Sequence, residues 1–295
     1  MKIADFYRSS VAKLKQSNIK TAELDVKILL KFVLENDEAF LLLHPQMPLT
    51  NYQFTKLKKL LKRRQNGEPI AYLTGHKEFF GHDFLVNRNV LIPRPESEFL
   101  VETALDFFKL KAKSKRLKAL DMGTGSGCII ISIAKELLTF NFQLSTKLFA
   151  SDISLKALNV ARKNADKHGA RKEIRFFHSD LFGNRLLHKK YDLIIANLPY
   201  VPIKSSNSKL RTPNSDGITF EPASAIFADD NGTAIIKKFL TEAKKYLNKN
   251  GQILIELDPR NALEIHKKAQ KLYPDAKIEL RKDLSGRDRY IILEN

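Results

Sequence analysis

The segment LKALDMGTGSG, residues 117–127, decides how the chain is interpreted. Its first half is an apolar run that favours a buried strand, and its second half carries Gly123, Gly125 and Gly127. Glycines at alternate positions let the backbone turn sharply and leave its N–H groups bare toward a ligand. The segment therefore predicts a strand, a ligand-binding turn and a following helix.

Strand-like and helix-like runs alternate after this segment. Such alternation indicates a mostly parallel sheet covered by helices on both faces. The segment RKDLSGRD, 281–288, is too short for a helical crossover, so the last two strands should be antiparallel. The expected fold is α/β, with a seven-stranded, mostly parallel Rossmann-like sheet and an antiparallel last strand. The expected strands are 117–121, 147–152, 173–177, 191–196, 252–257, 276–281 and 289–294, and the expected helices between them are 127–138, 154–168, 232–248 and 260–272.

Residues 1–75 show helical periodicity and no cluster of catalytic side chains. Helices are expected at 21–35, 50–65 and 69–74, the first of them beginning at a Thr21 cap. The stripe that the first of these helices should bury consists of Leu24, Ile28, Leu29, Phe32 and Val33.

Aromatic and β-branched residues surround Gly81 between 77 and 92, which predicts a β-hairpin. We therefore expect a small all-α domain, used for substrate recognition, then a hairpin linker and a larger α/β domain. The all-α domain is expected at 1–75, the hairpin linker at 76–95 and the α/β domain at 96–295. A polar loop at 203–219 is expected to be mobile beside the site.

Polar side chains are expected where four consecutive strands end, at Asp121, Asp152, Asp180 and Asn197. Because ligands of parallel sheets bind at the carboxyl ends of the strands, these side chains should line one site. Each of them alone could be an ordinary helix cap, but four of them in register with a glycine turn favour a ligand. Asp152 could accept both hydroxyls of a ribose, and Asp180 could accept an adenine amino group.

The ligand that this pattern predicts is S-adenosylmethionine. A glycine turn alone is weak evidence, because nicotinamide enzymes use one as well. The spacing here is G-x-G-x-G, however, whereas dinucleotide sites use G-x-G-x-x-G. Asp121 just before the turn would oppose a diphosphate but suits a cationic ammonium or sulfonium.

The segment IIANLPYVP, 194–202, follows the fourth strand and could be a plain turn or a clamp for a planar –NH2 group. In a clamp, the Asn197 side chain accepts one N–H, the carbonyl of Leu198 accepts the other, and Tyr200 stacks on the planar face. Pro199 biases Leu198 toward an extended backbone. The candidate catalytic residues are Asn197, Pro199 and Tyr200.

The chain resembles the release factor glutamine methyltransferases over nearly its full length. The segments that carry the resemblance are PIAYLTGHKEFFGHDFLVNRNVLIPRPESEFLVE (69–102), DMGTGSG (121–127), NLPYVP (197–202), FEPASAIF (220–227) and RKDLSGRDRYI (281–291). The resemblance implies a class I methyltransferase fold behind a helical domain and a hairpin linker. It also implies methyl transfer from S-adenosylmethionine to the N5 amide of the glutamine in the Gly-Gly-Gln motif of class 1 peptide chain release factors.

The resemblance and the strand-end pattern together give the expected site residues. The family's clamp is usually Asn-Pro-Pro-Tyr, so Leu198 is a departure, and Asn-Leu-Pro-Tyr also matches the rRNA adenine dimethyltransferases. Those enzymes lack the helical domain and the junction segment that this chain carries. The expected cofactor contacts are Asp121, Gly123, Thr124, Gly125, Ser126, Gly127, Asp152, Asp180, Leu181 and Asn197, and the expected glutamine contacts are Asn197, Leu198, Pro199 and Tyr200.

The net charge of +18, from 51 Lys and Arg against 33 Asp and Glu, fits either attraction to RNA or lysines spread over helix faces. The segment KLKKLLKRR, 56–64, favours the second interpretation, because its lysines alternate with leucines at helical spacing. We expect that nucleic acid is not required and that the protein is a monomer. The rival functions are adenine methylation of rRNA or DNA, and a non-catalytic binding module that would have lost some strand-end carboxylates.

Several further expectations follow from single residues. One cysteine, Cys128, excludes an internal disulfide, suits the cytoplasm and is expected to pack rather than react. The seven histidines show no ligand spacing, so no metal is expected, and no apolar run or signal peptide points to a membrane. Arg94 and Glu98 could approach the methionine end of the cofactor, or they could serve in a salt bridge or at the start of a helix. Glu221 could lie in a segment that covers the site, or it could anchor a loop.

Overall fold

The computed structural model describes residues 1–111, 117–139, 146–203 and 217–295. The chain forms two compact units. The helical unit contains residues 1–76 with 217–220, and the sheet unit contains residues 77–203 with 221–295. Most of the loop predicted at 203–219 lies outside the described residues, so its mobility stays a prediction.

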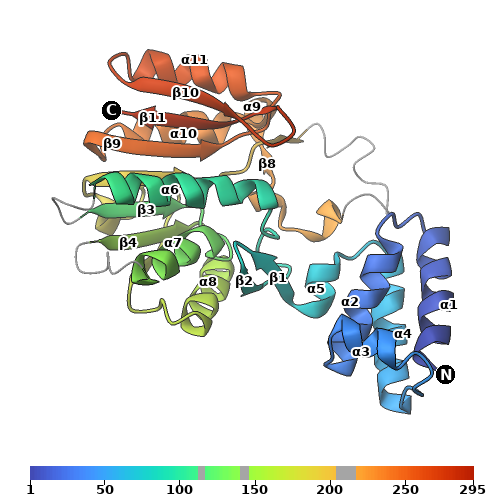
Figure 1. Ribbon diagram of the computed structural model, residues 1–295. Coiled ribbons are helices and arrows are strands. Elements are labelled where there is room, and N and C mark those ends of the chain that lie inside the picture. The colour runs from blue at the N-terminus through green and yellow to red at the C-terminus, as the bar shows by residue number, and fades with distance from the viewer. Residues whose placement is uncertain (112–116, 140–145, 204–216) are drawn as a thin grey trace. The chain divides into compact units, whose positions relative to one another are not determined.

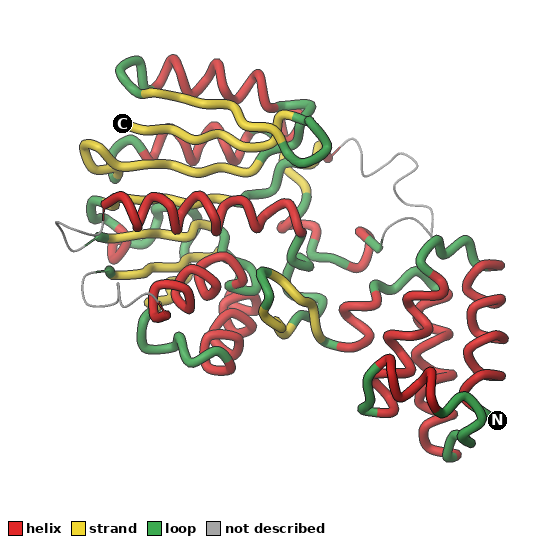
Figure 2. Tube along the Cα trace, in the orientation of Figure 1, coloured by secondary structure: helices red, strands yellow, loops and turns green. Residues whose placement is uncertain are grey.

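The helical unit consists of helices joined by loops around a core rich in leucine (Figure 2). Its longest helix begins at a capping box, in which Thr50 Oγ1 accepts a bond from Gln53 N at 3.2 Å and Gln53 Oε1 accepts one from Thr50 N at 3.0 Å. The helices are α1 (Ile3–Gln16), α2 (Ala22–Leu34), α3 (Glu38–Leu43), α4 (Asn51–Gln65) and α5 (Ile70–Thr74).

Two predictions for α2 are wrong in detail. The Thr21 hydroxyl does not cap the helix but donates to Asp25 Oδ2 at 2.9 Å. Leu24 is 56% exposed, because it lies about 200° around the helix from Val26, which is buried. The stripe that α2 buries consists of Val26, Leu29, Leu30, Val33 and Leu34, while Ile28 and Phe32 are half-buried.

The sheet unit confirms the predicted α/β fold (Figure 1). Its seven-stranded sheet has the order β10-β11-β9-β6-β3-β4-β5, and β11 runs antiparallel to both of its neighbours. Helices α6, α7 and α8 contribute to the core on one face of the sheet, and α10 and α11 contribute to the core on the other. The strands are β3 (Lys118–Met122), β4 (Lys147–Asp152), β5 (Ile174–His178), β6 (Tyr191–Ala196), β9 (Leu247–Glu256), β10 (Lys277–Lys282) and β11 (Asp288–Glu294), and the helices are α6 (Glu98–Lys111), α7 (Cys128–Thr139), α8 (Leu155–Lys167), α10 (Ala234–Ala243) and α11 (Ala262–Leu272).

Smaller elements connect these layers. The predicted hairpin is shorter than expected, with only β1 (His76–Phe79) and β2 (His82–Leu85) paired. A second small sheet joins β7 (Val201–Pro202) to β8 (Phe227–Ala228), directly after the Asn197 segment. Within the described residues, none of the helices combines the length and the apolar character that crossing a membrane requires.

The helix predicted at 232–248 is wrong at both ends. It stops at Ala243, because Leu247 pairs with Tyr191 and extends β9 toward its amino end. Before it, the short turn α9 (Asp229–Gly232) contains residues with left-handed backbone conformations. Gly232, with φ of 90°, is required there, because a Cβ atom at this position would lie 2.0 Å from the carbonyl oxygen of Tyr200.

We expect that Asp25→Ala destabilises the helical unit by about 3 kcal/mol, because it leaves a largely buried guanidinium without its partner. Arg64 Nε donates to Asp25 Oδ2 at 2.6 Å, and both side chains are at least 86% buried. Native-state hydrogen exchange of amides in the helical unit measures the opening free energy. The control is Asp5→Ala, which breaks the exposed pair with Arg8 and should cost less than about 1 kcal/mol. Equal effects of the two substitutions would contradict the prediction.

Candidate functional site

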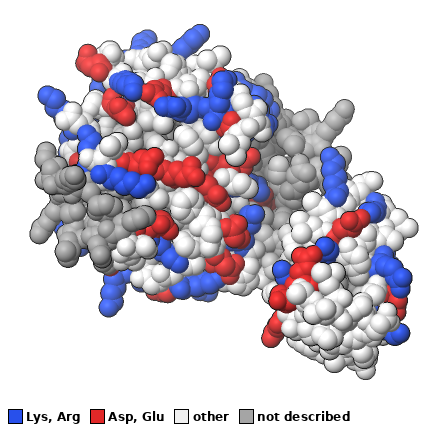
Figure 3. All heavy atoms as spheres, in the orientation of Figure 1, with Lys and Arg blue, Asp and Glu red and all other residues white. Residues whose placement is uncertain are grey.

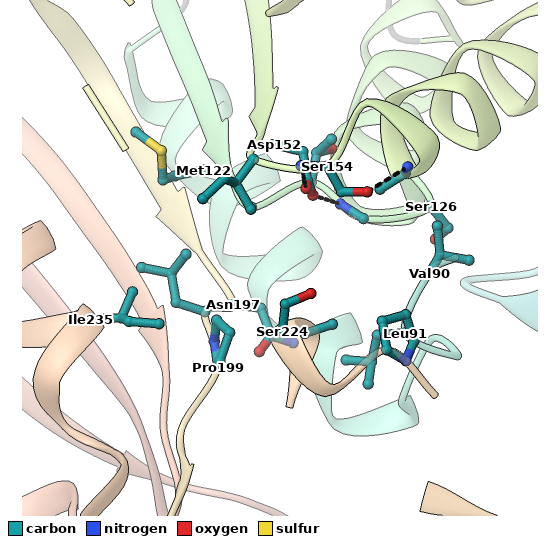
Figure 4. A pocket seen from close by; sticks show the side chains of 18 of the residues that line it. Val90, Leu91, Met122, Ser126, Asp152, Ser154, Asn197, Pro199, Ser224 and Ile235 are labelled. Carbon is teal, nitrogen blue, oxygen red and sulfur yellow. Dashed lines mark hydrogen bonds between the residues drawn. The ribbon is translucent and has the colours of Figure 1, made fainter. Parts of the chain in front are cut away.

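A cavity of about 480 Å³ lies at the carboxyl ends of β3, β4, β5 and β6 (Figure 4). Asp152 and Ser154 lie on one side of it and Asn197 and Pro199 on another. All the described residues that line it belong to the sheet unit. The predicted site residues that it brings together are Gly123, Thr124, Gly125, Ser126, Asp152, Asp180, Leu181, Asn197, Leu198 and Pro199.

Asp152 ends β4 and is held by two backbone donors. Its Oδ2 accepts a bond from Gly125 N at 2.8 Å, and its Oδ1 accepts one from Ser154 N at 2.8 Å (Figure 4). Burial raises the pKa of the Asp152 carboxyl, while the two backbone hydrogen bonds oppose that shift. Each carboxylate oxygen keeps a second lone pair, so the group can accept two further hydrogen bonds in a fixed geometry.

Asp121 lies beneath the glycine turn rather than among the described residues that line the cavity. Its Oδ2 accepts a bond from the Thr124 hydroxyl at 2.6 Å, and Thr124 does line the cavity. Burial raises the pKa of Asp121 to about 7. Asp121 therefore supports the turn from inside and is linked to the cavity through Thr124.

The glycine turn packs directly against the Asn-Leu-Pro-Tyr segment. A Cβ atom on Gly123, where φ is 75°, would lie 2.9 Å from Leu198 Cδ2, so the bare glycine leaves room for the leucine side chain. Gly127 is not among the lining residues, because it packs against Ile131 and Ala161. The turn and the segment after β6 thus form one packed unit through Leu198, which is buried.

The end of the cavity near β5 combines exposed charge with apolar side chains. Asp180 lies two residues beyond the end of β5, and its Oδ2 is 3.0 Å from Lys238 Nζ. Leu181 is buried in a left-handed conformation with φ of 44°. Ile153, which the sequence analysis missed, lines the cavity and is 59% exposed. In the sequence, an apolar residue directly after the strand-end carboxylate Asp152 could have marked Ile153 as a candidate lining residue.

Asn197 is held by two side chains that sequence analysis did not identify. Its Nδ2 donates to Ser97 Oγ at 2.9 Å and to Glu256 Oε2 at 3.0 Å. The Asn197 Oδ1 is therefore left as an acceptor beside the cavity. Tyr200 is not among the described lining residues, and its hydroxyl donates to Glu256 Oε1 at 3.0 Å. Burial raises the pKa of the Tyr200 hydroxyl.

Ser97 and Glu256 come from distant parts of the chain. Ser97 ends a short 3-10 helix at Pro95–Ser97, and Glu256 ends β9. Glu256 is fully buried although it is ionisable, and its position in the apolar run ILIEL, 253–257, was the signal that sequence analysis could have used.

The structure gives the contacts of the residues for which the sequence allowed more than one role. Arg94 lines the cavity and forms a salt bridge of 2.6 Å with Glu221, whose other oxygen accepts a bond from Ile92 N at 2.9 Å. Glu221 therefore anchors the linker. Glu98 Oε1 accepts a bond from Phe80 N at 3.0 Å, which ties the start of α6 to the hairpin. Cys128 lines the cavity, and burial raises the pKa of its thiol to about 12.

Comparison with known proteins identifies the family. The PrmC N-terminal domain family matches residues 5–75, and a methyltransferase domain family matches residues 113–288. The chain is 35% identical to the release factor glutamine methyltransferase of Koribacter versatilis, with 90% of each chain covered. It is 32% identical to the bifunctional methyltransferase of Rickettsia bellii, where 89% of this chain matches and the chain spans about half the length of that relative.

Solved structures share the fold. The catalytic domain of hMettl16, in complex with MAT2A 3′UTR hairpin 6, superimposes with a TM-score of 0.55 at 16% sequence identity, covering 83% of this chain and 81% of that chain. At that identity the likeness shows the fold alone. The sequence matches go further, and from them the chain belongs to the family of release factor glutamine methyltransferases, which are S-adenosylmethionine-dependent enzymes.

Proposed function

We propose that this protein transfers a methyl group from S-adenosylmethionine to the side-chain amide nitrogen of the glutamine in the Gly-Gly-Gln motif of a class 1 peptide chain release factor. The observation that carries the proposal is the orientation of Asn197. Its amide nitrogen is occupied by Ser97 and Glu256, so Oδ1 is the atom that a substrate meets. A hydrogen-bond acceptor at this point suits the N–H group of a primary amide.

The bare N–H groups predicted for the glycine turn are not found, because those of residues 123, 124, 125 and 127 already bond to Ser151, Asp152 and Thr124. Two other features of the cavity fit S-adenosylmethionine. Asp152 keeps free lone pairs for the two ribose hydroxyls, and Ile153 and Leu181 offer apolar surface for an adenine ring with Asp180 beside them. Asp121, through Thr124, favours the cationic methionine end. The bound cofactor supplies an electrophilic methyl group on a sulfonium.

The chain's own residues contribute position rather than covalent chemistry. Asn197 Oδ1 accepts one amide N–H and the carbonyl of Leu198 accepts the other, which aims the nitrogen at the cofactor side of the cavity. Stacking of the Tyr200 ring on the amide stays a prediction, since Tyr200 is not among the described lining residues. Its hydroxyl is bound to Glu256, so the ring is held in place directly after Pro199. Pro199 keeps Leu198 extended. Alignment of this kind lowers the barrier by removing orientational freedom before reaction.

The alternative, methylation of adenine in nucleic acid, is not favoured. The relatives from Koribacter versatilis and Buchnera aphidicola, each matched over at least 90% of both chains, are named release factor glutamine methyltransferases, and the helical unit matches the PrmC N-terminal domain. On the face shown in Figure 3, basic side chains are interspersed with acidic ones rather than gathered in one stripe. That distribution fits lysines spread over solvated faces, so the charge on this face gives no separate support for a nucleic-acid substrate.

We expect Asp152→Ala to weaken S-adenosylmethionine binding by about 1.5–3 kcal/mol, because it removes charged hydrogen bonds to the ribose. Isothermal titration calorimetry measures the affinity. Asp180→Ala is the matched control and should cost less, because the Asp180 side chain is 60% exposed and already paired with Lys238. Unchanged affinity in a folded Asp152→Ala protein would remove this residue from the cofactor site.

We expect Asn197→Ala to lower the turnover number by about 10²–10³-fold, the usual scale for losing one preorganised polar contact. Leu198→Pro keeps the carbonyl and fixes φ, so activity should be retained or raised, whereas Leu198→Gly loosens the backbone and should lower it modestly. Peptide mass spectrometry locates the methyl group on the release factor. If Leu198→Pro abolishes glutamine methylation while the native protein methylates adenine in rRNA, the glutamine assignment is wrong.

We propose that the helical unit positions the release factor. A fragment of residues 77–295 contains every described residue of the cavity, so it should bind the cofactor with native affinity. At limiting release factor it should methylate poorly, because the recognition surface is gone. Steady-state kinetics separates the two effects. Native kcat/KM in this fragment would refute the recognition role.

A further inference from the structure

We propose that Glu256 is a positioning residue that sets which atom of Asn197 faces the substrate, and that it thereby makes the site selective for acceptors carrying an –NH2 group. This inference rests on the proposed function, since it concerns how the clamp chooses its substrate. Glu256 itself is not among the described residues that line the cavity. It acts through Asn197 and Tyr200, which it contacts directly.

The sheet register places Glu256 beside the clamp. Strands β6 and β9 are parallel neighbours in which Ala196 is paired with Ile255. The next residue on each strand, Asn197 and Glu256, therefore emerges at the same edge of the sheet. Ser97, at the end of the short 3-10 helix Pro95–Ser97, reaches the same point, and its hydroxyl donates to Glu256 Oε2 at 2.6 Å.

Three donors converge on this one carboxylate. Oε2 accepts from Ser97 and Asn197, and Oε1 accepts from Tyr200. Burial raises the pKa of the Glu256 carboxyl, whereas the bonds from Ser97 and Tyr200 and the nearby charge of Arg289 oppose that shift. The Arg289 guanidinium is itself paired with Asp283 at 2.8 Å. The three hydrogen bonds that Glu256 accepts thus come from uncharged groups, the side chains of Ser97, Asn197 and Tyr200.

A carboxylate only accepts hydrogen bonds, and this fixes the amide of Asn197. If the amide turned over, Oδ1 would face Glu256 Oε2 and two acceptors would meet at about the 3.0 Å now spanned by a hydrogen bond. The turned amide could keep a bond to Ser97 only if the hydroxyl rotated to donate to Oδ1, which would break the bond of 2.6 Å from Ser97 Oγ to Glu256 Oε2. Both effects are large in a buried site, because unsatisfied polar groups there are costly.

The fixed amide gives the site its chemical preference. With Oδ1 toward the cavity, Asn197 accepts from an –NH2 group and repels a carboxylate oxygen. A glutamine side chain is therefore bound, and a glutamate side chain at the same place is rejected. Discrimination of this kind is strong, because the wrong group leaves buried polar atoms unpaired. Without Glu256 the amide could turn, and the clamp would lose both alignment and selectivity.

The decisive variants are Glu256→Leu and Glu256→Gln. Glu256→Leu should lower kcat for the release factor by about 10–10²-fold, the scale for losing a supporting hydrogen-bond partner, with the cofactor Kd changed by less than about twofold. The kcat of Glu256→Gln should lie within about tenfold of the native value. The oxygen of the glutamine side chain can accept from Asn197 and Ser97, and its nitrogen can donate to the Tyr200 oxygen. Native kcat in Glu256→Leu would overturn the proposal.

A double-mutant cycle separates positioning from general stability. Because the amide that Glu256 orients is absent from Asn197→Ala, adding Glu256→Leu should lower kcat by less than about threefold further, which leaves room only for the contact of Glu256 with Tyr200. Independent, multiplicative losses would overturn the proposal. The matched control is Gln252→Leu, a buried polar residue on the same strand, bonded to Glu294 at 3.2 Å and remote from the clamp. Its kcat should stay native.

A readout without turnover keeps the inference distinct from the proposed function. In proton–nitrogen NMR spectra, the Asn197 side-chain NH2 should be protected from solvent exchange in the native protein and unprotected in Glu256→Leu, and Asn197→Ala assigns the signal. Equal exchange in both would overturn the positioning role. If the native protein failed to methylate glutamine but the NH2 protection depended on Glu256, the proposed substrate would fall and the positioning role would remain.

Discussion

Parallel pairing of β3 with β4 and β6, and of β6 with β9, is the constraint on which the rest of this structure depends. Because parallel strands end at a common edge, residues far apart in the sequence arrive there together. The edge collects the glycine turn after β3, Asp152 from β4 and Asn197 after β6. It also brings Glu256 from β9 to within hydrogen-bonding distance of Asn197. The cavity and the hydrogen bonds behind it therefore exist because these strands are parallel and end at the same edge of the sheet.

Much of this edge could be predicted from the sequence, because its signals are local. A glycine turn, a strand-end aspartate and an Asn-x-Pro-Tyr run can each be read from fewer than a dozen neighbouring residues. The network behind Asn197 could not be read in this way. Ser97, Asn197 and Glu256 are separated by 59 residues or more along the chain and meet only through tertiary packing.

The errors in the predicted helices have two different origins. Leu247 continues a helical pattern, but its pairing with Tyr191 places it in β9. Threonine is a common capping residue, yet the Thr21 hydroxyl donates its hydrogen bond to the Asp25 carboxylate instead of accepting one from the helix backbone. The pairing of Leu247 is a long-range contact that overrides a local preference, whereas the Thr21–Asp25 bond is a competing local contact between residues four apart. At Leu198 the residue differs from the proline that is usual in the family, and its side chain fills the space beside Gly123.

Cys128 illustrates what burial does to a nucleophile beside a reactive ligand. Its thiol lines the cavity, yet burial raises the pKa to about 12. At neutral pH this side chain is therefore a thiol and not a thiolate. Since the thiolate and not the thiol is nucleophilic, Cys128 hardly competes with an incoming amide for a methyl group.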